Sequence, residues 1–155
     1  MEQRVIGVIS DTHGLLRPEA IEALRGSDLI LHAGDVGDPG ILEALAEIAP
    51  VTAIRGNIDT DPWARTLPET EVVEAGSISI YMLHNLGQLD LKPEAAGFGA
   101  VMHGHSHKPS IEKKNGVLYF NPGSAGPRRF HLPVSVGRLV IASGEVRAEL
   151  IQLMP

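Results

Sequence analysis

The hydrophobic residues in the first third of the chain form short apolar runs that alternate with segments of helical spacing. The runs at residues 5–9, 29–33 and 51–54 are rich in β-branched residues and predict strands buried on both faces. Between them, residues 18–24 begin with proline and end near a glycine, and residues 39–48 carry apolar side chains at helical spacing, so both are predicted to be helices. This alternation is typical of a parallel α/β sheet with right-handed crossovers.

The rest of the chain follows a different pattern, because most of its apolar runs are paired around short turn sequences. Three hairpins are predicted, with strands at residues 72–75 and 78–83, at 110–114 and 117–120, and at 134–142 and 145–153. A short helix is expected at residues 92–96 and a strand at residues 100–102, whereas residues 61–68 have the composition of a loop. We therefore expect a single domain over residues 1–155, with two sheets packed face to face and helices outside them.

Polar residues with metal-binding side chains follow the predicted strands. Asp11 and His13 follow the first strand, Asp35 the second and Asn57 the third, and His84 follows the second strand of the first hairpin. In open parallel sheets, ligands bind outside the carboxyl ends of the strands. The side chains at these strand ends are therefore expected to meet, although each residue taken alone could be a turn former.

Three histidines spaced two residues apart follow the strand at residues 100–102. Alternate residues of an extended segment point the same way, but Gly104 is expected to break this regularity. We predict that His105 and His107 are metal ligands and that His103 has a structural role.

The combined set of seven ligand-type side chains is large enough for two metal ions that share a bridging carboxylate, for which Asp35 is the natural candidate. The chain has no cysteine, so the ligands are limited to imidazole, carboxylate and amide groups, which suit Mn, Fe, Ni, Zn or Mg. Two carboxylates against two divalent ions leave a net positive site that favours a phosphate anion. A hydroxide held between metals about 3.5–4 Å apart would be a nucleophile at neutral pH.

Composition and charge exclude several other classes of protein. A hydrophobic content of 43% with 21% charged residues is that of a globular protein. No apolar run approaches the ~20 residues of a membrane span, and there is no signal-peptide cleavage pattern, so a cytoplasmic protein without membrane contact is expected. The net charge of −6 argues against general nucleic-acid binding.

The ordered motifs resemble those of the calcineurin-like metallophosphoesterases, and especially their small bacterial and archaeal phosphodiesterases. The motifs are Asp11-x-His13, Gly34-Asp35, Gly56-Asn57-x-Asp59, His84 and Gly104-His105-x-His107, and the likeness continues through Asn121-Pro122-Gly123-Ser124 and Pro133-Val134-Ser135. The resemblance implies a four-layer αββα sandwich of two mixed sheets flanked by helices. It also implies a phosphodiesterase that uses a metal-bridging hydroxide as the nucleophile.

The same resemblance assigns the ligands to two metal ions. It implies that one ion is held by Asp11, His13, Asp35 and His107, and the other by Asp35, Asn57, His84 and His105. Manganese is the first expectation, with Fe, Ni or Zn as alternatives. Catalytic roles are expected for Asp35, Asn57 and His105, and a substrate contact for Asn57.

The chain departs from the family pattern at Ile58. Many relatives have a histidine at this position, directly after Asn57, where it is thought to stabilise the transition state or protonate the leaving group. Ile58 can do neither, so we expect a preference for substrates with good leaving groups, such as aryl phosphodiesters. Asp59 has three open interpretations: a turn former, a residue that orients a ligand, or a replacement acid.

The roles of several other residues are open on sequence alone. Arg128 and Arg129 follow a family motif and are candidate phosphate contacts, since a guanidinium binds phosphate in a bidentate manner, but surface charge is an equal alternative. His32 lies in a predicted buried strand and is expected to be a core or supporting histidine rather than a ligand. His131 is expected to be a solvent-exposed loop residue.

Two other functions compete with the phosphodiesterase. One is a catalytically weak scaffold that binds partner proteins, as the retromer subunit of the same fold does, and Ile58 gives this alternative some weight. The other is a phosphomonoesterase that uses the same centre. The filled ligand positions favour an enzyme acting on a phosphodiester whose identity the sequence leaves open, and exposed sheet edges would permit a homodimer.

Overall fold

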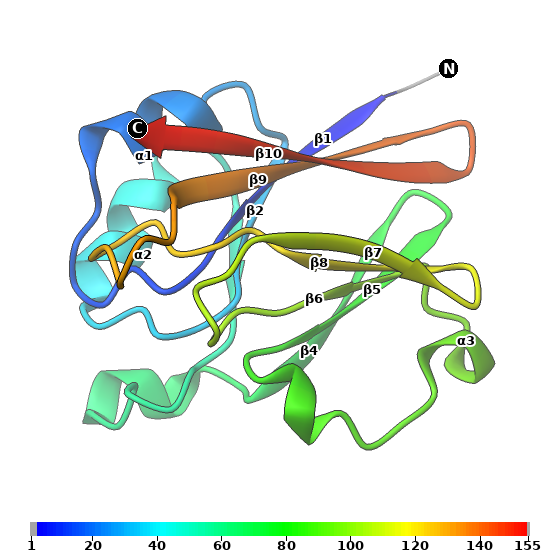
Figure 1. Cartoon of the computed structure of the whole chain (residues 1–155), viewed down its shortest axis with the longest axis horizontal. Coiled ribbons are helices and arrows are strands. Elements are labelled where there is room, and N and C mark those ends of the chain that lie inside the picture. The colour runs from blue at the N-terminus through cyan, green and yellow to red at the C-terminus, as the bar shows by residue number, and fades with distance from the viewer. Residues whose placement is uncertain (1–2, 155) are drawn as a thin grey trace.

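The computed structural model describes residues 3–154 as two five-stranded sheets packed face to face (Figure 1). The first sheet has the strand order β10 (Glu145–Met154), β9 (Val134–Ala142), β1 (Arg4–Ile9), β2 (Leu29–His32) and β3 (Val51–Ala53). The second has the order β4 (Thr70–Ala75), β5 (Ile78–Leu83), β6 (Ala100–Met102), β8 (Val117–Asn121) and β7 (Ser110–Lys114). The predicted sandwich is confirmed.

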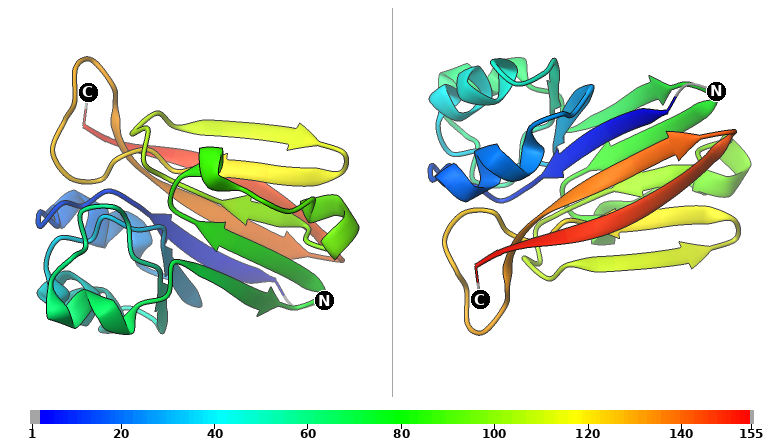
Figure 2. Two further views of the ribbon diagram at one scale, coloured as in Figure 1. Left: turned by 90° about the horizontal axis from the view of Figure 1, so that it is seen from below. Right: turned by 90° about the horizontal axis from the view of Figure 1, so that it is seen from above.

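Both sheets are mixed. Strands β1, β2 and β3 are parallel, as the alternating pattern predicts, and the hairpin of β9 and β10 returns to pair antiparallel with β1. In the second sheet, β6 is parallel to both β5 and β8, while β4 and β7 form antiparallel hairpins at the two edges. Figure 2 shows the second sheet in front when the molecule is seen from below, and the first sheet in front from above.

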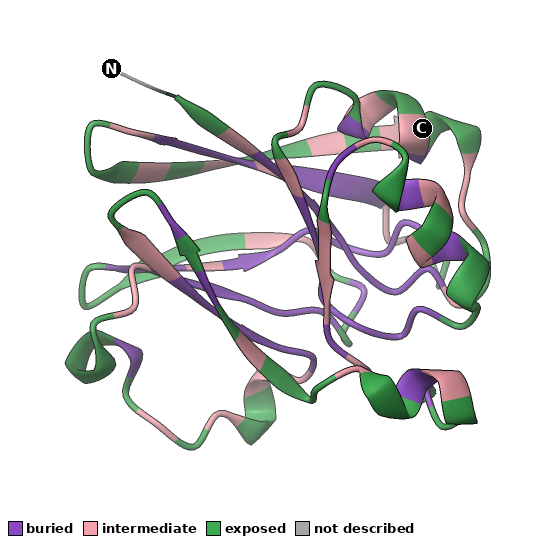
Figure 3. Ribbon diagram, turned by 180° about the vertical axis from the view of Figure 1, so that it is seen from behind, coloured by how far each residue is buried: buried purple, intermediate pink, exposed green. Residues whose placement is uncertain are grey.

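The main hydrophobic core lies between the two sheets, where buried residues concentrate in Figure 3. Ile6 and Val8 alternate on the inner face of β1 and meet Ile80, Met82 and Phe120 from the second sheet. Each such side chain contributes roughly 1.5–3 kcal/mol when it is fully buried. This core joins the strands whose ends carry the candidate ligands.

The outer face of the first sheet is covered by α1 (Pro18–Leu24) and α2 (Pro39–Ala46). Leu24 and Leu45 are their buried anchors. Helix α1 packs so closely on β1 that a Cβ at Gly7 would lie 2.7 Å from Leu24 Cδ2. Asp38 caps α2 by accepting a hydrogen bond from Gly40 N at 2.8 Å.

The outer face of the second sheet has a thinner cover. It consists of residues 86–98, with η2 (Leu86–Gln88) and α3 (Pro93–Ala96), whose apolar side chains contact Tyr81 and Leu83 of β5. This fourth layer is mostly loop, which leaves room for the cavity described below.

The structure differs from the sequence prediction mainly in short elements. Residues 61–68, predicted as a loop, contain the 3-10 helix η1 (Pro62–Thr66). Helix α2 ends at Ala46, two residues earlier than predicted. Among the described residues, no helix is both long and apolar enough to cross a membrane. Cytoplasmic location and a homodimer stay predictions.

Candidate metal centre

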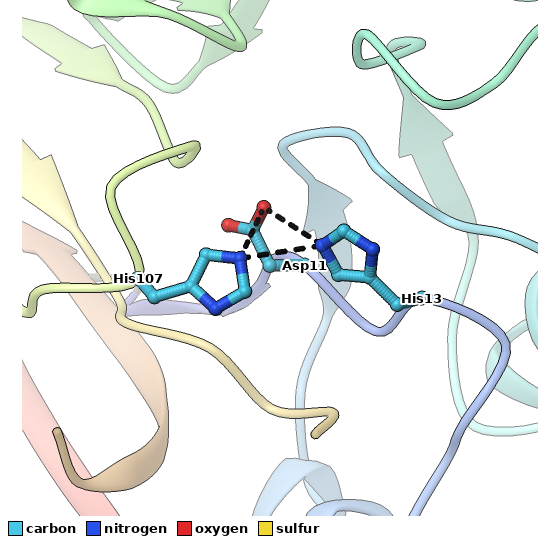
Figure 4. Close-up of side chains that lie close together, drawn as sticks. All are labelled: Asp11, His13 and His107. Atoms are coloured by element: carbon cyan, nitrogen blue, oxygen red, sulfur yellow. Dashed lines mark hydrogen bonds and ion pairs between the residues drawn. The ribbon is translucent and has the colours of Figure 1, made fainter. Parts of the chain in front are cut away.

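The first part of the centre brings together Asp11 and His13, after β1, and His107, after β6 (Figure 4). The Nε2 atoms of His13 and His107 are 3.3 Å apart. Asp11 Oδ1 lies 3.7 Å from Nε2 of His13 and 3.5 Å from Nε2 of His107. Two imidazoles and one carboxylate therefore point at a common space.

The second part is built around Asp35 and His84. His84 Nε2 lies 3.2 Å from Asp35 Oδ2 and 3.7 Å from Asp11 Oδ1. Asp35 Oδ2 also lies 3.4 Å from Nε2 of His13. Asp35 thus stands between the two parts, which is the position of a shared ligand.

Asn57 and His105 complete the set at its solvent-exposed side. His105 Nδ1 lies 3.1 Å from Asn57 Oδ1. The His105 ring stands edge-on to the His84 ring, with centroids 5.3 Å apart. The structure therefore brings all seven predicted ligand side chains together at the ends of strands from both sheets.

The arrangement fits divalent cations. Asp11 Oδ1 and His84 Nε2 are buried and have no hydrogen-bond partner within residues 3–154, and such atoms call for an explanation. The facing nitrogen and oxygen atoms are separated by 3.2–3.7 Å. Ligand bonds of about 2.0–2.2 Å place neighbouring ligand atoms roughly 3–3.5 Å apart around one ion, so these separations are close to those of a coordination shell.

Backbone strain is concentrated at these residues. Five of the seven have a left-handed backbone, namely Asp11 (φ 56°), His13 (φ 46°), Asp35 (φ 57°), His105 (φ 72°) and His107 (φ 64°). A non-glycine residue in this region costs of order 1 kcal/mol or more and persists only where its surroundings determine it. Here the loops bind one another, since Asp11 N donates to Gly34 O and His13 N donates to Asp35 O.

The glycines of the motifs allow these loops to approach. A Cβ at Gly34, which itself has φ 104°, would lie 2.7 Å from His84 Nδ1. At Gly56 a Cβ would collide with Asp35 Oδ1, and at Gly104 with Ser10 Oγ. A larger residue at any of the three would push a candidate ligand out of place.

Supporting hydrogen bonds orient the candidate ligands. His84 Nδ1 donates to Ala33 O at 2.8 Å, which leaves Nε2 unprotonated and directed at Asp35 when the ring is neutral. Asp35 Oδ1 accepts from Ile58 N at 3.1 Å. Asp11 Oδ2 accepts from Ser10 Oγ at 2.7 Å and from His105 N at 3.1 Å. Ser10 was not singled out by sequence, because a serine after a strand carries no specific signal.

His32 hydrogen-bonds to the loops that carry the candidate ligands. Its Nδ1 accepts from Gly34 N at 3.1 Å, so its Nε2 donates to Thr12 Oγ1 at 3.0 Å, and this hydroxyl donates to Val36 O at 2.8 Å. Complete burial lowers the pKa of His32 to about 4, so the ring is neutral. The supporting role expected for this histidine agrees with these contacts.

The carboxylate of Asp59 is occupied by three backbone groups. It accepts from Val36 N at 3.1 Å, Gly37 N at 3.0 Å and Gly56 N at 2.8 Å. Asp59 is buried, and both of its carboxyl oxygens accept hydrogen bonds from these backbone groups. Of its three interpretations, these contacts support the orienting role.

Charge interactions keep the central carboxylates ionised. Burial acts to raise the pKa of Asp11, but the interactions with His13, 3.7 Å away, and with the nearby His84 outweigh it and lower the pKa. For Asp35, burial is likewise outweighed, by His84 and Ile58 N, so its pKa is also lowered. Burial acts to lower the pKa of His84, but Asp35 and Asp11 raise it. The site therefore carries the negative charge that a divalent cation needs.

The remaining sequence candidates do not belong to the two groups of candidate ligands. Arg128 and Arg129 are exposed in a loop over residues 127–133. Burial lowers the pKa of His107, the charge of Asp11 opposes this shift, and the charge of Arg129 adds to it. His103 is buried outside the ligand groups with its pKa lowered by burial to about 4, and His131 is exposed, as expected.

Comparison with known proteins gives a consistent result. Residues 5–144 match the model of the calcineurin-like phosphoesterase superfamily domain. A probable metallophosphoesterase from Methanothermobacter thermautotrophicus is 36% identical over 160 residues, covering 96% of this chain and 92% of the relative. A phosphodiesterase from Methanocaldococcus jannaschii is 26% identical over 136 residues, covering 76% of this chain and 82% of the relative.

A solved structure shares the whole fold. Vacuolar protein sorting 29 from Cryptosporidium parvum has a TM-score of 0.75 at 21% identity, and the match covers 97% of each chain. At this identity the likeness concerns the fold alone.

Proposed function

Since this chain belongs to the calcineurin-like phosphoesterase superfamily, we propose that it hydrolyses phosphodiesters with two divalent metal ions held by its seven converging side chains. The family and the names of the relatives establish a metal-dependent phosphoesterase. The preference for diesters is supported by the Methanocaldococcus jannaschii relative, which is named a phosphodiesterase. Manganese is the first expectation, and Fe, Ni or Zn accept the same ligands.

The position of Asp35 carries the proposal of two ions. Its Oδ2 atom lies 3.2 Å from His84 Nε2 and 3.4 Å from His13 Nε2. One carboxylate thus serves both parts of the centre. Asp11, His13, Asp35 and His107 would hold one ion, and Asp35, Asn57, His84 and His105 the other.

The residues of the chain prepare the site for a phosphodiester. Divalent ions bound here would neutralise the phosphoryl oxygens and lower the pKa of water toward about 7. Burial of Asp11, Asp35 and His107 excludes bulk water from the inner side, while Asn57 and His105 are exposed and are placed to meet the substrate. The hydrogen bond from Ile58 N fixes Asp35 in orientation.

The third motif supplies no proton to the leaving group. The side chain of Ile58 is 41% exposed and has no ionisable atom, and the carboxylate of Asp59 is bound to backbone N–H groups. A leaving group that departs as a stable anion is therefore favoured. Aryl phosphodiesters are therefore expected to be better substrates than alkyl phosphodiesters.

The proposal is tested by hydrolysis of bis-p-nitrophenyl phosphate by chelator-treated protein, with and without added manganese. Metal-dependent turnover is expected for the wild type and for Asp61→Asn, a change at an exposed aspartate, and should be lost in Asp35→Asn. Equal turnover with and without metal, or full activity of Asp35→Asn, would contradict it. p-Nitrophenyl phosphate assayed in parallel distinguishes a phosphomonoesterase.

A scaffold is the second candidate. It is supported by Ile58 and by the shared fold with vacuolar protein sorting 29. Metal binding without turnover of any monoester or diester would favour it over the hydrolase.

A further inference from the structure

A cavity of about 560 Å³ opens beside the metal centre, and Asn57, His84 and His105 form one of its walls. The other walls include Arg55, Glu69, Tyr81, Gln88 and Asp90. We propose that this cavity binds an ester group of the substrate and selects an uncharged group that carries hydroxyls, such as a glyceryl or sugar group. The inference rests on the proposed function, because it concerns the substrate of the same centre.

The size and place of the cavity indicate an organic group. Cavities of 300–1,000 Å³ are typical of small-molecule sites, and a phosphate alone needs far less space. The cavity lies between the candidate ligands and the thin cover of the second sheet, over Tyr81 and Leu83 of β5. A phosphodiester whose phosphate lies at the metal centre would place one of its ester groups here.

The polar lining matches hydroxyl groups. Glu69 and Asp90 offer carboxylate acceptors, Gln88 offers an amide, and the Arg55 guanidinium offers donors. A guanidinium nitrogen of Arg55 lies 3.3 Å from a carboxylate oxygen of Glu69, so the donor and the acceptor are adjacent. A hydroxyl is an uncharged group that can donate to a carboxylate and accept from a guanidinium through one atom, and hydrogen bonds to charged partners are the stronger ones.

The charge of the lining disfavours an anionic ester group. Among the residues that line the cavity, Glu69 and Asp90 are acidic and Arg55 is the single lysine or arginine. Their sum is one negative charge, which would repel a second phosphate or a carboxylate.

The lining also offers little aromatic surface. Tyr81 is the one aromatic ring besides the histidines of the centre, and its side chain is 8% exposed. Its ring is stacked on Phe98, with centroids 5.1 Å apart at 20°. The cavity thus lacks the open ring face that a nucleobase or a quaternary ammonium group uses.

A matched pair of substrates tests the selectivity. 2,3-Dihydroxypropyl p-nitrophenyl phosphate and propyl p-nitrophenyl phosphate share the leaving group and the chain length and differ only in two hydroxyls. In the wild-type protein with manganese we expect kcat/KM to favour the dihydroxypropyl ester roughly tenfold or more. The preference should fall to near parity in Glu69→Gln and Asp90→Asn, and should be retained in Glu94→Gln, a change at an exposed residue of α3.

Three results would overturn the inference. These are equal kcat/KM for the two esters, a preference that survives both Glu69→Gln and Asp90→Asn, and a stronger preference for a trimethylammonioethyl ester. Calorimetric binding of 2,3-dihydroxypropyl and propyl methylphosphonates to the metal-loaded protein measures the same selectivity without turnover. Loss of turnover with intact binding selectivity would therefore contradict the proposed function alone.

Discussion

His13 and His107 are 94 positions apart in the sequence, yet their Nε2 atoms lie 3.3 Å from each other. Asp11 Oδ1 is the third member of this contact, 3.5 Å from His107 Nε2. A hydrogen bond between the two rings would leave the buried Asp11 Oδ1 without a partner, whereas a cation at the common point would bind both imidazoles and the carboxylate. The contact is made by β1 and β6, one strand from each sheet, so the centre depends on the assembled sandwich.

We predict that a histidine at position 58 restores proton donation to poor leaving groups. Ile58→His should raise kcat/KM for methyl phenyl phosphate at least tenfold and change that for methyl p-nitrophenyl phosphate much less, because only the first leaving group needs a proton. Ile58→Gln is the matched control without an acid. Equal rates of the wild type on the two esters would already count against this reasoning.

Asp59 should affect metal binding by holding the loops that carry the candidate ligands in position. Asp59→Asn replaces an acceptor of three backbone hydrogen bonds, so we expect unfolding free energy to fall by about 1–3 kcal/mol. Manganese affinity, measured by calorimetry, should fall roughly tenfold or more. If the variant instead binds manganese normally and loses the alkaline limb of its pH–rate profile, Asp59 is the acid after all.

Arg129 should contribute to binding of the anionic substrate. Its charge reaches His107, so Arg129→Gln should raise KM for bis-p-nitrophenyl phosphate several-fold with a smaller change in kcat. The effect should shrink at high salt because the arginine is exposed. Arg65→Gln, at another exposed arginine, is the control, and identical KM values for the two variants would assign Arg129 to plain surface charge.

Stability of the metal-free protein should depend on pH through His32. Its pKa is about 4 in the folded protein against about 6.5 in the unfolded chain. Between these values the unfolded chain binds a proton that the folded protein does not, so stability falls as pH decreases from about 6.5 toward 4, by up to roughly 3 kcal/mol. His103 acts in the same direction and His84, whose pKa is raised, in the opposite one.

The measurement is urea unfolding at pH 7, 6 and 5 in the presence of chelator. His32→Gln should be less stable than the wild type at pH 7, and the difference should shrink at pH 5. A difference that stays constant across this range would show that His32 does not resist protonation in the folded protein.

The elements that could be predicted from sequence are those with a simple pattern. Helix α1 was predicted with its observed bounds, Pro18–Leu24, because a proline begins it and a glycine follows its end closely. Helix η1 was missed, because a short 3-10 helix leaves no such pattern. The thin cover over the second sheet depends on tertiary packing of isolated apolar residues such as Leu89 and Phe98.

In the candidate site, too, some features could be predicted from sequence and others could not. The seven ligand-type residues could be identified because they end strands that converge in an α/β sheet. The left-handed backbone of His105 and His107 could not be predicted, since most histidines do not adopt it and the surrounding loops impose it here. The role of Asp59 and the cavity beside Arg55 arise from contacts between loops distant in sequence.

The central claim is that the converging side chains hold two ions that share Asp35. Crystals grown with manganese and measured at the manganese absorption edge test it most directly. The account predicts two anomalous peaks per chain, one among Asp11, His13, Asp35 and His107 and one among Asp35, Asn57, His84 and His105. A single peak, or peaks away from Asp35, would contradict it.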